Sequence, residues 1–260
     1  MAALEKAAAL GEQGRWSEAL TALDGAQGLL DTSAPGGLVE RLHQARADAD
    51  MVAELEEIRL RQSDGGKSQE TASLSPEKMY ADAFRTYGIP LLTLEPADAA
   101  ARVRNSLIRH TLLVFMHDWL HWVSDENRAQ LRNVLDRADD DDWRYAFREA
   151  LVENDAAKLN ALAHAPAASS QPPVVLSGFA GAMLGDKYKN EALAVMREAQ
   201  QHHPGDFWIN YLLGCFWWDV YPQEAVGYFR AAVAIRPTSD QAYRCWEEPC
   251  AVQGTRTGRS

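Results

Sequence analysis

Two stretches of the sequence decide the fold: EALAVMREAQQHHP at 191–204 and EAVGYFRAAVAIRP at 224–237. Each begins with Glu-Ala, continues with a large apolar residue followed by arginine, places a second alanine further on and ends in proline. The matched alanines at 192 and 225 are 33 residues apart. Self-similarity at a period of roughly 20–50 residues is typical of architectures in which one small unit is repeated. The two stretches therefore predict an array of similar units in this part of the chain.

The residues that the two copies share are those that a pair of packed helices needs. The alanines of each copy let two helices approach closely, and Pro204 ends the second helix of its unit. Gly178 and Gly214 stand in the preceding helices, where a close crossing again requires a small residue. The period and these positions resemble the tetratricopeptide repeat, a helical hairpin of about 34 residues. We therefore expect two tetratricopeptide-like units and the start of a third over 174–246.

The N-terminal residues 1–61 predict one more such hairpin followed by a long helix. The segment GRWSEAL at 14–20 resembles the turn and second helix of the repeat, and the alanine-rich segment 2–13 is expected to be its first helix. From Val39 to Arg61 the chain has few helix breakers and carries apolar residues at helical spacing. This stretch predicts a single continuous helix.

The rest of the chain predicts short helices joined by linkers. The remaining segments are expected in this order: a flexible linker over 62–75, an irregular helical middle segment over 76–164, a second linker over 165–173 and a disordered tail over 247–260. Ser75 is expected to cap a helix that begins at Pro76. The helices expected in the middle segment span 77–87, 97–104, 106–123, 126–137, 143–153 and 156–164. Since no segment alternates with the period of a strand, the fold is predicted to be all-α, a tetratricopeptide-like α-solenoid with an irregular helical middle segment.

Charge and composition argue against two classes of partner. The 260 residues carry a formal net charge of −11, whereas nucleic-acid binding needs clustered Lys and Arg. The longest apolar run, at 112–116, is far shorter than a membrane span. The first residues include Glu5 and Glu12 and lack the apolar segment of an export signal. The three cysteines have no framework spacing. We therefore expect a cytoplasmic protein that binds neither nucleic acid nor membrane.

Several short motifs point to one family of proteins. They are VAELEEIRLR at 52–61, YADAFR at 80–85, Asp118-Trp119, Trp143-Arg144 and HPGDFW at 203–208. They resemble the C-terminal half of planctomycete-type bacterial serine/threonine protein kinases, in which helical and tetratricopeptide segments follow an N-terminal kinase domain. The sequence lacks a Gly-rich nucleotide loop, a His-Arg-Asp catalytic loop and an Asp-Phe-Gly motif. The resemblance therefore implies a non-catalytic part of a kinase-associated protein.

Histidine is the best candidate for catalytic chemistry in this sequence. His117 and His121 are one helical turn apart, with Asp118 where zinc hydrolases carry a general-base glutamate. His110 lies nearly two turns before His117, on the same face. The opposite face is apolar, so the three histidines are expected to point to solvent. Because a catalytic zinc also needs a third ligand, a second shell and a pocket, we expect no metal here.

Two other groups of polar residues have structural interpretations. Cys245 and Cys250 are spaced too loosely for a zinc knuckle, so both are expected to be free thiols. The four aspartates at 139–142 lack the ligand pattern of a calcium loop. They are expected at the N-terminus of a helix, where negative charge interacts favourably with the helix dipole. The sequence therefore predicts no cofactor.

The segment 207–220 is apolar on nearly all sides, which indicates a helix that is buried from more than one direction. Its face with Trp217 is expected to pack against the helix over 223–235. A second face is formed, at helical spacing, by Trp208, Tyr211, Cys215 and Trp218. This second face lines a peptide-binding groove in one interpretation, because the first helix of each tetratricopeptide unit faces the concave surface. In the other interpretation it packs against a neighbouring helix of the same chain.

The sequence thus predicts a protein–protein interaction or scaffold module without a catalytic site. The expected partner is a protein or peptide, held by the second face of 207–220. Three alternatives belong to other classes: a fragment of a serine/threonine kinase, a metal-dependent hydrolase using His117 and His121, and a structural spacer without a partner.

Overall fold

The described part of the chain is helical throughout. The computed structural model describes residues 2–12, 16–27, 36–63, 75–183, 189–218, 221–237 and 239–247. These residues form fourteen helices and no strand, so the all-α prediction is confirmed. None of these helices is long and apolar enough to cross a membrane. Most of the linker predicted over 62–75 and nearly all of the tail predicted over 247–260 lie outside the described residues.

The chain divides into two compact units, unit 1 over Met1–Ala138 and unit 2 over Asp139–Ser260. The boundary falls inside the middle segment that the sequence predicts over 76–164. An aromatic contact explains this position, because the ring centroids of Trp143 and Phe179 lie 5.0 Å apart. The end of the predicted middle segment therefore packs with the C-terminal half of the chain.

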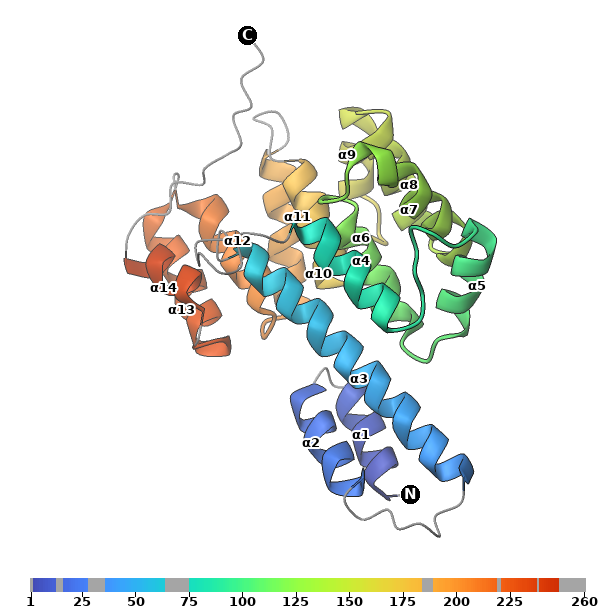
Figure 1. The fold of residues 1–260 in the computed structure, drawn as a ribbon. Helices are drawn as coiled ribbons and strands as arrows, with labels where there is room; N and C mark the ends of the chain where they lie inside the picture. The colour runs from blue at the N-terminus through green and yellow to red at the C-terminus, as the bar shows by residue number, and fades with distance from the viewer. Residues whose placement is uncertain are drawn as a thin grey trace. The chain divides into compact units, whose positions relative to one another are not determined.

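Unit 1 begins with a pair of helices packed on a long one. Its helices are α1 (Ala2–Glu12), α2 (Trp16–Gln27), α3 (Gly36–Ser63), α4 (Pro76–Thr86), α5 (Pro96–Asn105), α6 (Arg109–Trp119) and α7 (Asp125–Ala138). α1 and α2 lie side by side against the N-terminal half of α3 (Figure 1). Their common core consists of Ala7, Leu10, Ala19, Leu23, Leu42 and Ala49. The structure thus contains the N-terminal helix pair and the long helix that the sequence predicts.

The C-terminal half of α3 belongs to a larger core that α4, α5, α6 and α7 complete. Val52 and Leu55 are buried in it, as their spacing on a helix predicts. The ring of Trp119 in α6 stacks with the rings of Tyr80 and Phe84 in α4, at centroid distances of 5.7 and 5.6 Å. This apolar and aromatic contact holds α3, α4 and α6 together.

A buried charged pair crosses the same core. The carboxylate of Asp118 accepts a hydrogen bond of 2.6 Å from the Tyr80 hydroxyl. It also lies 3.6 Å from Nε of Arg59, and both of these charged side chains are almost entirely buried. A buried charge is costly unless it is paired and hydrogen-bonded. The three residues come from α3, α4 and α6, so the pairing restricts how these helices can pack.

Helix ends follow the prediction at α4 and differ from it at α6. The side chain of Ser75 caps α4 by accepting a hydrogen bond from the backbone N–H three residues further on. The helix expected over 106–123 is shorter in the structure, where α6 spans Arg109–Trp119. Ser106 explains the late start, because its Oγ accepts a hydrogen bond of 3.2 Å from the backbone N–H of Ile108. This side chain stabilises a turn in competition with the first helical turn.

Unit 2 contains the repeated segments. Its helices are α8 (Asp142–Val152), α9 (Ala156–Ala163), α10 (Pro173–Ala182), α11 (Lys189–His202), α12 (Phe207–Trp217), α13 (Pro222–Ile235) and α14 (Asp240–Glu247). The alanines shared by the two copies lie in α11 and α13 and are fully buried: Ala192, Ala199, Ala225 and Ala232. Met196 and Phe229, at the shared large apolar position, are also fully buried. Equivalent sequence positions therefore have equivalent burial.

α12 and α13 approach each other closely at Gly214. A Cβ atom placed on Gly214 would lie 2.6–2.8 Å from three ring carbons of Phe229. These distances are well below an ordinary van der Waals contact, so the crossing requires a residue without a side chain. The sequence predicts a small residue at this point for the same reason.

We expect Gly214→Ala to lower the free energy of unfolding by about 1–3 kcal/mol, because the added methyl group overpacks the contact with Phe229. Gly227→Ala is the matched control, since Gly227 is exposed in α13 and no atom lies within 4 Å of its Cβ position. Alanine in place of an exposed helical glycine raises stability by about 0.5–1 kcal/mol. Urea unfolding followed by circular dichroism measures both variants. A Gly214→Ala variant as stable as Gly227→Ala would contradict the close crossing.

Candidate functional site

The aromatic face of α12 that the sequence singles out packs against helices of its own unit. The rings of Tyr211 and Trp218 lie 6.2 and 6.1 Å from that of Phe229 in α13. The Tyr211 hydroxyl is 3.9 Å from Sγ of Cys245 in α14. Trp208 is half-buried against its neighbour Tyr211. These contacts agree with the interpretation in which this face meets other helices of the same chain.

On the opposite face of α12, Trp217 contacts α11, a neighbour that the sequence does not predict for this face. The sequence assigns the face with Trp217 to the helix over 223–235, which is α13. In the structure the guanidinium of Arg197 in α11 lies over the Trp217 ring, 4.5 Å from its centroid. The Trp217 ring centroid also lies 5.0 Å from that of Tyr221, the residue directly before α13. Trp217 thus has a partner in α11 that the sequence does not predict, because an all-round apolar helix does not reveal which neighbours cover each side. The packing of the rest of this face on α13 stays a prediction.

We expect Trp218→Ala to destabilise unit 2, because truncation removes the ring contact with Phe229. Truncation of a fully buried aromatic residue lowers the free energy of unfolding by about 3–5 kcal/mol. The decrease for Trp218→Ala should be smaller, because Trp218 is half-buried. Val152→Ala in α8 of the same unit is the control, because Val152 is 58% exposed and its truncation is expected to cost less. Thermal unfolding compares the two. If Trp218→Ala melted at the same temperature as the wild type, the contact between Trp218 and Phe229 would not contribute to the stability of unit 2.

The histidines of α6 do not converge on one site. His110 and His121 are exposed, but His117 is only 4% exposed, so the prediction that all three face solvent is wrong for His117. The reason is that α6 packs against α4, α5 and α7 and is therefore buried on more sides than one apolar stripe suggests. No group of three or more His, Cys, Asp or Glu among the described residues could hold a metal ion.

The cysteines show no reactive thiol in the described part of unit 2. Burial raises the pKa of the Cys215 thiol to about 11, which leaves it protonated and weakly nucleophilic at neutral pH. Cys245 is disulfide-bonded, so the prediction of a free thiol at this position is wrong. The predicted free thiol of Cys250 lies outside the described residues. The disulfide also removes the argument from cysteine usage for a reducing compartment.

The run of aspartates over 139–142 is structural, as predicted, and in part buried. Asp141 caps α8 by accepting a hydrogen bond of 2.7 Å from the backbone N–H of Arg144. The buried carboxylate of Asp139 accepts hydrogen bonds of 2.8 Å from Nε of Arg144 and 3.0 Å from Nη1 of Arg148. These interactions neutralise the buried charge of Asp139 within unit 2 and stabilise the N-terminus of α8.

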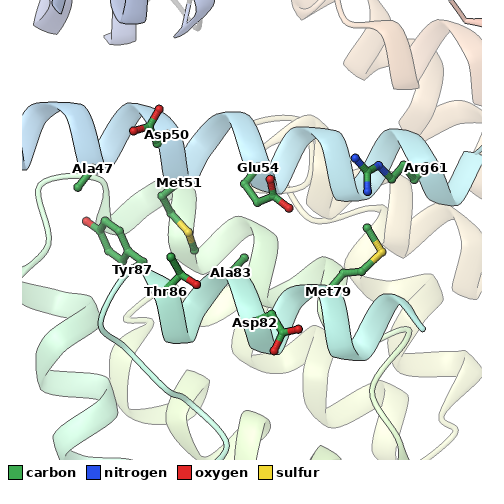
Figure 2. Close-up of a pocket in the computed structure, with 10 residues that line it drawn as sticks. All are labelled: Ala47, Asp50, Met51, Glu54, Arg61, Met79, Asp82, Ala83, Thr86 and Tyr87. Carbon is green, nitrogen blue, oxygen red and sulfur yellow. The ribbon is translucent and has the colours of Figure 1, made fainter. Parts of the chain in front are cut away.

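The best candidate site is a pocket of about 550 Å³ between α3 and α4 of unit 1 (Figure 2). The two helices run antiparallel there, with Tyr87 below Ala47 at one end and Met79 below Arg61 at the other. The lining residues of α3 are Ala47, Asp50, Met51, Glu54 and Arg61. Those of α4 and its C-terminal end are Met79, Asp82, Ala83, Thr86 and Tyr87. Most of these residues are three or four apart, so each helix presents one stripe to the pocket.

The pocket has an apolar floor and a polar rim. Met51 and Ala83 are buried at its base, and Met79 is half-buried. Figure 2 shows Met51, Glu54 and Met79 directed into the space between the two helices. The exposed lining residues are Ala47, Asp50, Glu54, Arg61 and Thr86. A pocket of this size and composition suits a ligand with an apolar part and a charged part.

A hydrogen-bond network holds the end of the pocket at Tyr87. The Tyr87 hydroxyl donates to Oδ1 of Asp48 at 2.6 Å and lies 2.8 Å from Oγ of Ser106. Gln44 Nε2 donates to the same carboxylate oxygen at 2.7 Å. Burial raises the pKa of Tyr87 well above its ordinary value, and the adjacent Asp48 carboxylate acts in the same direction. Because α3, α4 and the residues before α6 all contribute, the pocket wall is fixed at this end.

We expect Tyr87→Phe to lower the free energy of unfolding by about 1–3 kcal/mol at neutral pH, because buried Asp48 loses its phenol donor. The raised pKa means that the stabilisation by the neutral phenol is complete below about pH 10 and is lost as pH rises further. Alkaline destabilisation above pH 10 should therefore be weaker in the variant than in the wild type. Tyr145→Phe, on a residue 46% exposed, is the control and should change stability by less than about 0.5 kcal/mol. Unfolding curves recorded at several pH values give the free energy of unfolding of each variant. If that free energy fell equally steeply above pH 10 in Tyr87→Phe and in the wild type, the hydrogen-bond network would be ruled out.

The sequence does not predict this pocket. It points to the aromatic residues of α12, whereas methionine, alanine and acidic side chains make up most of the pocket lining. A signal was present in α4, where Met79 lies one helical turn from Ala83, at the edge of the core that contains Tyr80 and Phe84. A helix with apolar residues on a second side has a second surface to cover, but the sequence does not show that α3 lies beside it.

Neither protein-family models nor curated proteins nor solved structures match this chain. Its function must therefore be inferred from its own residues and their geometry.

Proposed function

We propose that this protein is an interaction module, and that the pocket between α3 and α4 receives a segment of a partner protein. The observation that carries the proposal is the pocket's construction, with buried Met51 and Ala83 as the floor and exposed charged side chains as the rim. Apolar surface that is rimmed by polar residues is typical of protein-binding sites. Methionine side chains are flexible and polarizable, which suits them to contact with another protein.

The arrangement of α3 and α4 favours a helical segment as the bound element. Two antiparallel helices present parallel stripes of side chains, and the space between them has the form of a helix-binding groove. From Ala47 to Arg61 the groove is about 21 Å long, at a rise of 1.5 Å per residue. This length accommodates about four turns of a bound helix.

The described polar residues favour binding over catalysis. The Cys215 thiol is buried and protonated, and His117 is buried while His110 and His121 are exposed. Asp118 and Asp139 are engaged in pairs inside their own units. None of these groups lines the pocket between α3 and α4.

The proposal extends to the architecture of unit 2. We assign α10 with α11 and α12 with α13 as two tetratricopeptide-like hairpins. The assignment is supported by the 33-residue offset and by full burial of the shared positions, for example Ala199 and Ala232. The crossing at Gly214 supplies the small residue that this motif requires in the first helix of a unit.

A kinase-associated role is the context we propose for the module. It rests on the resemblance to the C-terminal half of planctomycete-type kinases. The residues that carry this resemblance include Tyr80, Phe84, Trp119 and Trp143, which are buried packing residues. The resemblance therefore supports a shared helical framework, within which the module serves a regulatory or scaffolding function.

Site-specific photo-crosslinking tests the proposed function. A benzophenone amino acid at Thr86, on the pocket rim, should give one discrete adduct in native cell extract. The same group at Lys78, exposed on α4 outside the pocket, is the matched control. Glu54→Trp should fill the pocket and reduce the Thr86 adduct about tenfold, which corresponds to about 1.4 kcal/mol. Mass spectrometry identifies the adduct.

Equal labelling from Thr86 and Lys78 would contradict the proposal, as would a Thr86 adduct that survives Glu54→Trp. Circular dichroism of each variant checks that unit 1 is still folded.

A further inference from the structure

We infer that the segment bound between α3 and α4 is an amphipathic helix with basic residues beside its apolar stripe. This inference rests on the proposed function and specifies the chemistry of the partner. It follows from the charge of the pocket, from the nature of its floor and from the charge of the whole chain.

The charged residues that line the pocket are mainly acidic. Asp50, Glu54 and Asp82 contribute three carboxylates, and Arg61 contributes the one cation among the lining residues that the structure describes. The Arg61 guanidinium donates to Glu57 at 2.9 Å within α3. Three carboxylates against one guanidinium leave these lining residues with an excess of negative charge. The lining therefore favours a cationic ligand.

Glu54 is the carboxylate best placed to meet a partner. It is exposed at the middle of the α3 stripe, is directed into the pocket, and makes no ion pair with another described residue. Asp50 and Asp82 have partners of their own, Arg46 at 3.2 Å and Arg85 at 2.8 Å. Such exposed pairs within one helix are weak because water and salt screen them, so both carboxylates can turn to a bound cation at little cost.

The floor of the pocket selects the rest of the ligand. Met51, Met79 and Ala83 offer an apolar surface that a small hydrophilic cation would leave uncovered. Lysine and arginine carry aliphatic stems that cover apolar surface while their charged ends reach carboxylates. A helix with apolar residues at its centre and Lys or Arg at its flanks meets both requirements, and a free amine meets only one.

A second copy of this chain is a poor occupant. The protein carries a formal net charge of −11, so an acidic pocket and a second acidic molecule repel each other. The partner is therefore expected to be a different protein with a basic helical segment.

A displayed library of helical peptides tests the inference without knowledge of the partner. The library keeps an apolar stripe constant and randomises the flanking positions. Selection uses the full chain, and counter-selection uses its Glu54→Trp variant, so that the retained peptides depend on the pocket. We expect the retained pool to be enriched in Lys and Arg at the flanks. Their affinity should fall as salt increases, because the pairs that form are near the surface.

Charge-neutralising variants complete the test. Glu54→Gln with Asp82→Asn keeps the shape of the pocket and should weaken the selected peptides about five- to tenfold at low salt. Glu40→Gln is the matched control, since Glu40 is exposed on α3 outside the pocket and should leave affinity unchanged.

Each other outcome overturns the inference. A pocket-dependent pool that is neutral or acidic, or one that is insensitive to the double variant, would exclude a basic ligand while leaving the proposed function intact. A pool without pocket-dependent peptides would exclude a helical ligand, and the Thr86 crosslink would then decide the proposed function separately. A concentration-dependent dimer that Glu54→Trp dissociates, seen by sedimentation, would assign the pocket to a second copy.

Discussion

The packing of α3 against α4 is the interaction on which unit 1 depends. Val52 and Leu55 are buried in the same core as Tyr80 and Phe84, and the antiparallel course of the two helices follows from this contact. Since one side of each helix is used in the core, the adjoining sides are left to form the pocket. The site is therefore a consequence of how the core is built, and a change in the α3–α4 contact would alter both.

Buried carboxylates specify the arrangement more narrowly than apolar packing does. Asp48 is bound by Tyr87, Asp118 by Tyr80, and Asp139 by Arg148. A buried charge that loses its partner costs several kcal/mol, so each pair penalises any shift of the helices that carry it. The first two pairs connect α3 or α6 to α4 and its C-terminal end. They fix the walls of the pocket, and a fixed surface loses less entropy than a mobile one if a ligand binds to it.

In unit 2, the repeated helices pack closely through small residues. The contact between Gly214 and Phe229 brings α12 and α13 together, and the buried alanines at the repeated positions serve the same purpose. The aromatic residues of α12 are divided among α11, α13 and α14. Tyr211 and Trp218 therefore contribute to the framework of unit 2 through their contacts with Phe229.

The sequence by itself determined the helical class, the repeat in α11 and α13, the position of most helices and several of their caps. These features depend on local propensity and on residues a few positions apart, such as Ser75 before Pro76 or the aspartates before α8. Only the tertiary structure decided that α6 buries His117, that Tyr211 and Trp218 pack on Phe229, and that α8 belongs to unit 2. It alone showed the pocket, because Met51 and Met79 are distant in the sequence and become neighbours only when α4 packs antiparallel to α3. Which side of a helix is covered depends on contacts between distant segments, and no local pattern of residues contains that information.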